Sequence, residues 1–300
     1  MKIKLAYGKT GLEINVDENH LSAVYQKQKM IPLENSDNTL HEGLRSPAET
    51  QPLAALASGR KSACIVINDI TRPVPNAFLL LPILEEIHQA GIKPDDIIIL
   101  IATGTHRPNE GEEIIELVGP EIALNYRIVN HNWLDRENLR SIGRTRSGTE
   151  VWLNRLYLDA DLKILTGLIE PHFMAGYSGG RKVLCPGLAG IDTMKRIHGT
   201  HFLESEYATN CILKDNLLHE ELCEIADMAG VDFIVNVVLN EEREVCGVFC
   251  GDVNAAHLHG VRFSSQFDRV DAAEPADIVV TSSAGYPLDK TYYQAIKGLV

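Results

Sequence analysis

Apolar residues along the chain recur in two patterns that alternate with each other. Residues 63–69, 96–102 and 161–168 are short, continuously apolar runs, which are typical of strands buried on both faces of a sheet. Between them, residues 76–90 and 109–118 place apolar side chains at helical spacing. Strands that alternate with helices in this way predict an α/β fold with a mostly parallel sheet and helices on both of its faces.

The remaining segments add a hairpin, an edge strand and further helices. Residues 2–6 and 12–16 flank a Gly-Lys-Thr-Gly turn and predict an opening hairpin. Residues 20–52 are polar and weakly periodic, so we expect a loop there with a helix near its end. Further along the chain we expect a strand at 232–239, helices at 216–228 and 254–267, and a hairpin edge at 244–250.

The pattern changes near residue 271, where Asp-Ala-Ala-Glu-Pro follows a predicted helix. After it, residues 277–281 predict a new strand, and a helix is expected to begin near Thr291 and run to Val300. We therefore predict an N-terminal α/β domain over residues 1–270, which carries most of the functional residues. Residues 271–300 would be the start of a second α/β domain that breaks off within a helix.

Composition and charge exclude several classes of protein. The net charge is −13, from 28 Lys and Arg against 41 Asp and Glu, which argues against a nucleic-acid partner. The chain has no run of roughly 18 apolar residues and no signal peptide, so we expect a cytoplasmic protein without a membrane span. Six scattered cysteines without a C-x-x-C pair suit a reducing compartment better than a disulfide framework.

Three polar loops follow the predicted buried strands, at residues 68–73, 103–108 and 170–182. Ligands of open α/β sheets bind outside the carboxyl ends of the strands, so three such loops suggest one shared site. His106 and His172 stand in two of them and can serve as acid or base near neutral pH. Two bases on opposite faces of a carbon are what inversion of a stereocentre requires. Ordinary loop histidines bonded to the backbone remain the alternative.

Other residues in these loops carry weaker signals. Residues 176–182 form a glycine-rich loop that ends in lysine, but they depart from the phosphate-binding P-loop pattern, and a flexible turn is an equal interpretation. His198 and His201 lack the glutamate of the H-E-x-x-H zinc motif, so capping or core histidines explain them better. Arg72 can hold a carboxylate with two parallel hydrogen bonds, although solvated arginines are common.

Taken in order, these segments resemble the nickel-dependent lactate racemase family. The resemblance extends from the first buried strand to the last residues of the chain. Each segment alone is only a weak indication of the family, but the segments taken together in this order are specific for it. The segments are Asn68-Asp69-x-Thr71-Arg72-Pro73, Thr103-Gly104-x-His106-Arg107-Pro108, Glu170-Pro171-His172-Phe173, Ser178-Gly179-Gly180-Arg181-Lys182, His198 and Tyr293-Gln294-Ala295-x-Lys297-Gly298.

The resemblance implies a racemase of D- and L-lactate that works by hydride transfer through a tethered cofactor. This cofactor is nickel pyridinium-3,5-bisthiocarboxylic acid mononucleotide, the nickel-pincer nucleotide, which dedicated synthesis enzymes supply. By position, Lys182 would hold the cofactor covalently and His198 would ligate the nickel. His106 and His172 would alternate as base and acid. The other implied roles are substrate binding by Arg72, Gln294 and Lys297, and cofactor positioning by Asp69, Ser178, Gly179 and Gly180.

Three alternatives remain at this point. The substrate could be another 2-hydroxy acid, such as malate or a sugar acid, because the motifs do not define the substrate side-chain pocket. Family members continue for roughly another hundred residues, the size of a domain. Without them the chain could be a cofactor-binding protein that lacks activity. An ordinary nicotinamide dehydrogenase is disfavoured because the G-x-G-x-x-G fingerprint is absent.

Overall fold

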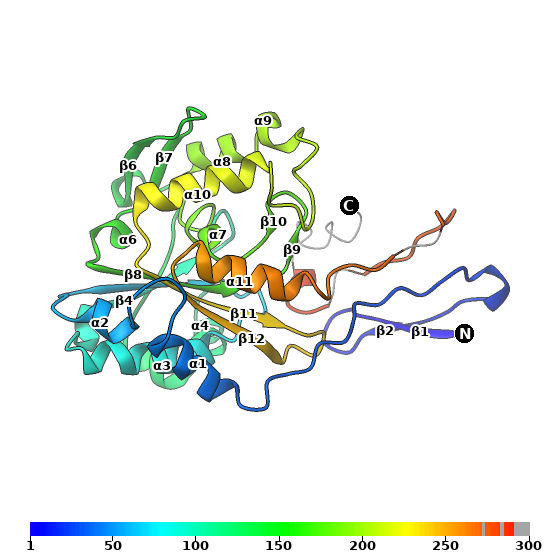
Figure 1. Ribbon diagram of the computed structural model, residues 1–300, viewed down its shortest axis with the longest axis horizontal. Coiled ribbons are helices and arrows are strands. Elements are labelled where there is room, and N and C mark those ends of the chain that lie inside the picture. The colour runs from blue at the N-terminus through cyan, green and yellow to red at the C-terminus, as the bar shows by residue number, and fades with distance from the viewer. Residues whose placement is uncertain (272–273, 283–284, 291–300) are drawn as a thin grey trace.

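A six-stranded sheet runs through the centre of the computed structural model, which describes residues 1–271, 274–282 and 285–290 (Figure 1). The strand order is β12-β11-β8-β3-β4-β5, and all neighbours are parallel except β12, which pairs antiparallel with β11 at one edge. The strands are β3 (Ala63–Asn68), β4 (Ile97–Ala102), β5 (Arg127–Asn130), β8 (Leu162–Leu168), β11 (Phe233–Leu239) and β12 (Val245–Gly251). The predicted fold class is confirmed.

Side chains alternate between the two faces of the central strands and join two separate hydrophobic clusters. On β3, Val66 lies opposite Leu100 and Leu165, and these three pack in one cluster. Ile65 and Ile67 point to the other face and join the second cluster. Because the central strands carry apolar side chains on both faces, both faces need a cover of helices.

Helices cover both faces of the sheet, as Figure 1 shows. One face carries α1 (Ser36–Arg45), α2 (Leu53–Ala57), α3 (Asn76–Gln89), α4 (Glu112–Val118) and α5 (Pro120–Asn125). The other carries α6 (Arg155–Asp159), α7 (Arg181–Leu184), α8 (Ile191–Ile197), α9 (Thr200–Leu203), α10 (Leu217–Ala229) and α11 (Ala255–Ser264). Short 3₁₀ helices lie at Glu18–His20, Pro94–Asp96, Arg136–Asn138 and Leu288–Lys290. Within the described ranges, no helix has the length and apolar character needed to cross a membrane.

Some expected elements differ from the structure. The helix expected at 109–118 begins only at Glu112, after Gly111 with a φ of 56°. The strand expected at 277–281 is not formed, because these residues find no strand to pair with in the described part of the chain. The hairpin of β6 (Leu139–Arg144) and β7 (Glu150–Asn154) has no counterpart in the sequence prediction. The helix expected from Thr291 lies outside the described residues.

The opening hairpin, β1 (Lys2–Leu5) with β2 (Leu12–Asn15), forms as predicted and extends beyond the body of the sheet (Figure 1). Its turn contacts the last described segment. The Gly8 amide donates to Asp289 Oδ2 at 2.6 Å, and the Tyr286 amide donates to the Gly8 carbonyl at 2.9 Å. Tyr286 also donates from its hydroxyl to Glu116 on α4 at 2.7 Å. Residues 285–289 are therefore held between the hairpin turn and α4.

The connections of β3 create a crevice at the carboxyl ends of the strands. From β3 the chain continues to β4 and β5 on one side, whereas β8 and β11 lie on the other. Loops that leave neighbouring strands in opposite directions open a crevice between them, which is where open α/β sheets bind ligands. The three polar loops identified in the sequence follow β3, β4 and β8 and meet at this point.

Candidate active site

A cavity of about 460 Å³ lies at the carboxyl ends of β3, β4 and β8. It is closed on one side by α8, which contributes Ile191, Met194 and Lys195. Most of the predicted site residues line it: Asp69, Arg72, His106, His172, Ser178, Gly179, Lys182 and His198. Gly180 does not line the cavity, and Gln294 and Lys297 lie outside the described residues. The fold thus brings residues from positions 69 to 198 to one place.

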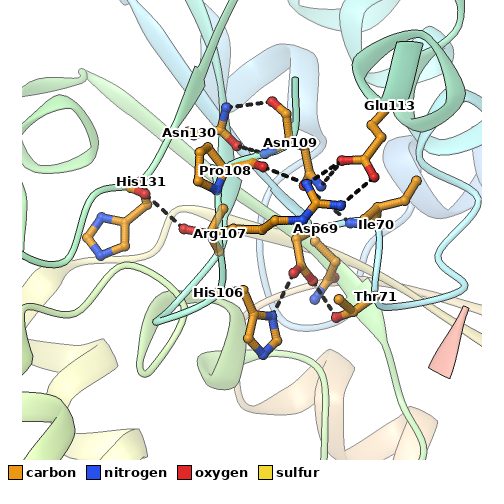
Figure 2. Close-up of polar contacts among 12 residues, drawn as sticks. Asp69, Ile70, Thr71, His106, Arg107, Pro108, Asn109, Glu113, Asn130 and His131 are labelled. Carbon is orange, nitrogen blue, oxygen red and sulfur yellow. Dashed lines mark hydrogen bonds and ion pairs between the residues drawn. The ribbon is translucent and has the colours of Figure 1, made fainter. Parts of the chain in front are cut away.

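Asp69 and His106 form a hydrogen-bonded pair between the loops after β3 and β4 (Figure 2). His106 Nδ1 lies 2.7 Å from Asp69 Oδ2, and Asp69 also accepts from the Thr71 hydroxyl at 2.8 Å. Asp69 is only 4% exposed. A carboxylate can only accept, so His106 donates from Nδ1 and keeps a lone pair on Nε2. Such a pair orients an imidazole and selects which of its nitrogens carries the proton.

The residues after His106 fasten its loop to the rest of the sheet edge (Figure 2). Arg107 turns away from the cavity and binds both carboxylate oxygens of Glu113, at 2.8 and 2.6 Å. Asn109 accepts from the Ile70 amide at 3.3 Å and exchanges two 2.8 Å hydrogen bonds with Asn130. Asn109 thus joins the loops after β3 and β4, and Asn130 ties it to the end of β5. Neither asparagine could be identified from the sequence, because a single Asn carries no distinguishing pattern.

His172 ends β9 (Pro171–His172), which pairs with β10 (Gly176–Tyr177) across a tight loop. Its Nδ1 accepts from the backbone amides of Met174 at 3.2 Å and Ala175 at 3.3 Å. The ring also stacks on Phe173, with the ring centres 5.0 Å apart. His172 is 6% exposed, so these contacts fix both the position and the orientation of its ring.

The Ser178 hydroxyl and the Gly180 amide of the glycine-rich loop make hydrogen bonds to other parts of the protein. Ser178 donates from its hydroxyl to the Leu168 carbonyl at 2.7 Å, and the Gly180 amide donates to Asn236 Oδ1 at 3.0 Å. A Cβ on Gly179 would come within 2.7 Å of the same Asn236 oxygen, which explains the glycine there. Gly180 therefore faces the sheet, whereas Ser178 and Gly179 reach the cavity. Asn236 on β11 is a supporting residue that sequence reasoning missed.

Arg181 lies behind this loop and is fully buried, at 1% exposure. Its Nη1 contacts the His257 ring nitrogens at 2.7 and 3.1 Å, and its Nη2 donates to the Ala175 carbonyl at 3.4 Å. Burial lowers the pKa of Arg181 to about 10. Burial also lowers the pKa of His257, with a further contribution from the Arg181 charge. Arg181 therefore supports the loop and does not contribute a side chain to the cavity.

Arg72 and Glu170 form an ion pair in the wall of the cavity. Only Nη1 of Arg72 takes part, and its side chain is 16% exposed. The cavity also contains Lys182, Lys195 and Asp69, which gives three cationic side chains against two carboxylates. An acidic protein thus carries a local excess of positive charge where an anion could bind.

His198 follows α8, and its ring is fixed by one hydrogen bond. Nδ1 lies 2.9 Å from the Met194 carbonyl oxygen, to which it donates. Burial, and to a smaller extent the charge of Lys182, lowers the pKa of His198. His198 is therefore neutral at pH 7, with a lone pair on Nε2. His201 does not line this cavity, so the two histidines are not brought together there.

The fold and the cavity together define an α/β protein whose site combines three histidines with a local positive charge. Comparison with known protein families identifies the family of this protein. The lactate racemase N-terminal domain matches residues 7–210, and the lactate racemase C-terminal domain matches residues 271–300. The chain belongs to the lactate racemase family, whose named members are isomerases.

Individual relatives agree with this family. A lactate racemase of Thermoanaerobacterium thermosaccharolyticum is 36% identical over 299 residues, which are 99% of this chain and 70% of the relative. One of Lactiplantibacillus plantarum is 35% identical over 300 residues, with the same coverage. The solved lactate racemase apoprotein of T. thermosaccharolyticum matches all of this chain and 70% of its own, with a TM-score of 0.89 at 35% identity.

A more distant structure shares the fold alone. A Thermotoga maritima protein covers 81% of this chain with a TM-score of 0.65 at 22% identity, and the match covers 61% of that protein. At this identity the similarity concerns the arrangement of helices and strands.

Proposed function

We propose that this protein interconverts D- and L-lactate by hydride transfer through a nickel-pincer nucleotide tethered to Lys182. The observation that carries the proposal is the convergence of four side chains on one cavity: His106, His172, Lys182 and His198. The cavity volume of about 460 Å³ lies in the range of small-molecule and cofactor sites. The names of the two curated relatives support lactate as the substrate.

The donor atoms in the cavity suit this cofactor. His198 offers a neutral imidazole with a lone pair on Nε2, which is a good nickel ligand. One imidazole cannot hold a metal alone, and the described residues contain no group of three His, Cys, Asp or Glu placed to bind one. The other donors would therefore come from the sulfur atoms of the cofactor. Lys182 lines the same cavity and would supply the covalent link.

The remaining residues would bind and orient the hydroxy acid. Arg72 would hold its carboxylate, together with Gln294 and Lys297. His106 and His172 would handle the hydroxyl proton. When bound, the nickel-pincer nucleotide would supply the chemistry of hydride transfer at C2, from which either enantiomer can form again. Asp69, Ser178 and Gly179 would position the cofactor from the cavity wall.

Two alternatives share the same cavity. A racemase or epimerase of malate or a sugar acid would use the same proton-transfer and carboxylate-binding residues. A protein that holds the cofactor without turnover would need only Lys182 and His198. Racemisation measured on D- and L-lactate and on a panel of 2-hydroxy acids separates the substrates. Cofactor content without turnover on any acid would identify a cofactor-binding protein.

Intact-mass and nickel analysis of protein expressed with the cofactor-synthesis enzymes tests the tether. We expect a mass increase and bound nickel in the parent, and neither in Lys182→Ala. Lys195→Ala is the matched control, because Lys195 lines the same cavity but is exposed, and it should keep the adduct. An unchanged adduct in Lys182→Ala would show that the cofactor is attached elsewhere.

A further inference from the structure

We propose that Glu170 restricts this protein to 2-hydroxy acids that carry a single carboxylate. The proposal rests on the proposed function and deepens it, because it decides one question left open there: lactate has one carboxylate and fits, whereas malate has two and is excluded. It comes from a fixed negative charge that lies beside Arg72, the cation assigned to the substrate carboxylate.

The carboxylate of Glu170 lies in the wall of the cavity, next to Arg72. Its Oε1 accepts a hydrogen bond from Arg72 Nη1, and its side chain is 28% exposed. Within the described ranges, no hydrogen-bond donor reaches the other oxygen, Oε2. Glu170 therefore presents negative charge to the cavity and shares the guanidinium with any anion that binds there.

The backbone of Glu170 fixes where this charge lies. Its amide donates to the Ser178 hydroxyl oxygen at 3.0 Å, and its carbonyl accepts from the Ser178 amide at 2.9 Å. Ser178 in turn donates from its hydroxyl to the Leu168 carbonyl, at the end of β8. Together with the ion pair to Arg72, these contacts hold both the backbone and the side chain of Glu170. The carboxylate can leave the cavity wall only by breaking the ion pair.

One carboxylate can bind to the remaining N–H groups of Arg72, as the proposed function requires, because Glu170 uses only Nη1. A second carboxylate on the same small acid lies only a few bonds from the first, so it stays close to Arg72 and Glu170. There it meets a guanidinium that is already shared between two anions. The negative charge of Glu170 then repels it without compensation.

The other described charged side chains that line the cavity do not offset this repulsion. Asp69 adds a second fixed carboxylate, beside His106. Lys182 is assigned to the cofactor, and Lys195 is an exposed residue of α8 whose charge is screened by water and salt. A carboxylate that reached Lys195 would form only an exposed ion pair, which stabilises a complex little.

The apolar part of the lining favours an uncharged substituent on the acid. Val183, Pro186, Ile191 and Met194 all contribute to it. These side chains suit a methyl group or a short alkyl chain, whereas a carboxylate placed against them loses hydration without gaining a hydrogen bond. Charge and apolar surface thus both favour a monocarboxylic acid, the class to which lactate belongs.

Two ligands of nearly the same shape test the effect of the charge. Malate and its 4-amide, malamate, differ in whether the distal group is charged. Isothermal titration calorimetry with the racemic ligands at pH 7.5 gives both dissociation constants, on cofactor-loaded protein and on apoprotein. We expect the parent to bind malamate at least about tenfold more tightly than malate, the effect of one nearby like charge in a protein.

Glu170→Gln isolates the contribution of the negative charge, because Gln keeps an oxygen that can accept from Arg72. The preference for malamate should fall about tenfold, and kcat/KM for malate relative to lactate should rise by a similar factor. Glu150→Gln is the matched control, since Glu150 is also paired with an arginine, Arg144, but lies on β7 outside the cavity. It should leave both ratios unchanged.

The proposal is wrong if the parent binds malate as tightly as malamate, if it binds neither, or if Glu170→Gln keeps the parental preference. An equal change in Glu150→Gln would also contradict it. Failure of the proposed function gives a different result: the loaded parent would racemise no 2-hydroxy acid. The two dissociation constants would even then show whether Glu170 selects against a second carboxylate.

Discussion

Arg72 and Glu170 come from the loops after different strands, yet their side chains form an ion pair in the cavity wall. A guanidinium has five N–H donors in a planar fork, and Glu170 contacts only Nη1. Glu170 can therefore hold the guanidinium in one orientation while another edge of it binds a carboxylate. An ammonium at the end of a flexible chain could not divide its contacts in this way.

Replacing Arg72 by Lys should keep the charge but lose the paired geometry. We expect kcat/KM on lactate to fall about 10- to 100-fold, the effect of losing one charged hydrogen bond. Arg107→Lys is the control, because the Arg107 side chain is 65% exposed and binds Glu113 outside the cavity. Racemisation assays on protein with equal nickel content check both. The prediction is wrong if Arg72→Lys and Arg72→Ala racemise every acid that the parent accepts at the rate of the parent. The substrate carboxylate would then be bound by other residues.

The sequence predicted which side chains reach the cavity better than it predicted their partners. Asp69, His106 and His172 lie in the loops that follow three buried strands. The carboxyl ends of these parallel strands meet at one edge of the sheet, which brings the three side chains together. The partners depend on how each turn closes. Asp69 was expected beside the cofactor and is bonded to His106, which lies 37 residues away in the sequence. Glu170 belongs to one of the segments that resemble the family, but no role could be predicted for it. Its ion pair joins two loops that are 98 residues apart in the sequence.

The loop between β9 and β10 shows how very short elements can fix the position of a side chain, here that of His172. Each of its strands has only two residues, and their pairing brings Gly176 opposite His172. The close approach of Ile212 and the positive φ of Gly176 leave no room for a side chain. The loop is therefore closely packed although it contains little regular structure.

We expect Gly176→Ala to destabilise the protein far more than Gly148→Ala. Both glycines have a positive φ, of 74° and 87°, but a Cβ on Gly148 would meet nothing within 4 Å. Gly148→Ala should cost only the roughly 1–2 kcal/mol of left-handed backbone. Gly176→Ala adds the overlap with the Ile212 carbonyl. Urea unfolding measures both, and equal losses in the free energy of unfolding would show that the loop can move away.

Long elements of one pattern were predictable, and short ones were not. The continuous apolar run at 63–69 became β3, Ala63–Asn68, within one residue. By contrast, α7 has four residues and α8 has seven, which is about two turns or fewer and too few to show helical spacing. The first of these helices carries Lys182, and the second ends just before His198. The elements nearest the two residues proposed to bind the cofactor were therefore the least visible in the sequence.

Buried histidines make the stability of the whole protein depend on pH. Burial lowers the pKa of His131 to about 4 and that of His219 to about 3. The folded state therefore favours neutral rings, whereas the unfolded chain takes up protons below its ordinary histidine pKa of about 6.5. The stabilisation is complete above that pH. As the pH falls below about 6.5, the His131 contribution is lost down to about pH 4 and the His219 contribution down to about pH 3.

His131 alone should account for about 3 kcal/mol of this loss, since its pKa falls from 6.5 to about 4 and a pKa difference of one corresponds to about 1.36 kcal/mol. Urea unfolding at several pH values between 4 and 7.5, on the parent and on His131→Gln, measures the contribution. We expect the variant to have a lower free energy of unfolding at pH 7.5 and a flatter pH dependence. The same slope in both proteins would show that His131 stays neutral when unfolded or becomes charged without cost.

The contact between Gly8 and Asp289 joins residues 281 positions apart in the sequence, and it bears on the order of folding. The hairpin of β1 and β2 pairs with no other strand in the described ranges, and an isolated two-stranded hairpin is marginally stable in water. Synthesis releases Gly8 281 residues before Asp289. All six strands of the central sheet lie between the two segments, so they are synthesised before the hairpin can gain these contacts, and its docking can follow formation of the sheet.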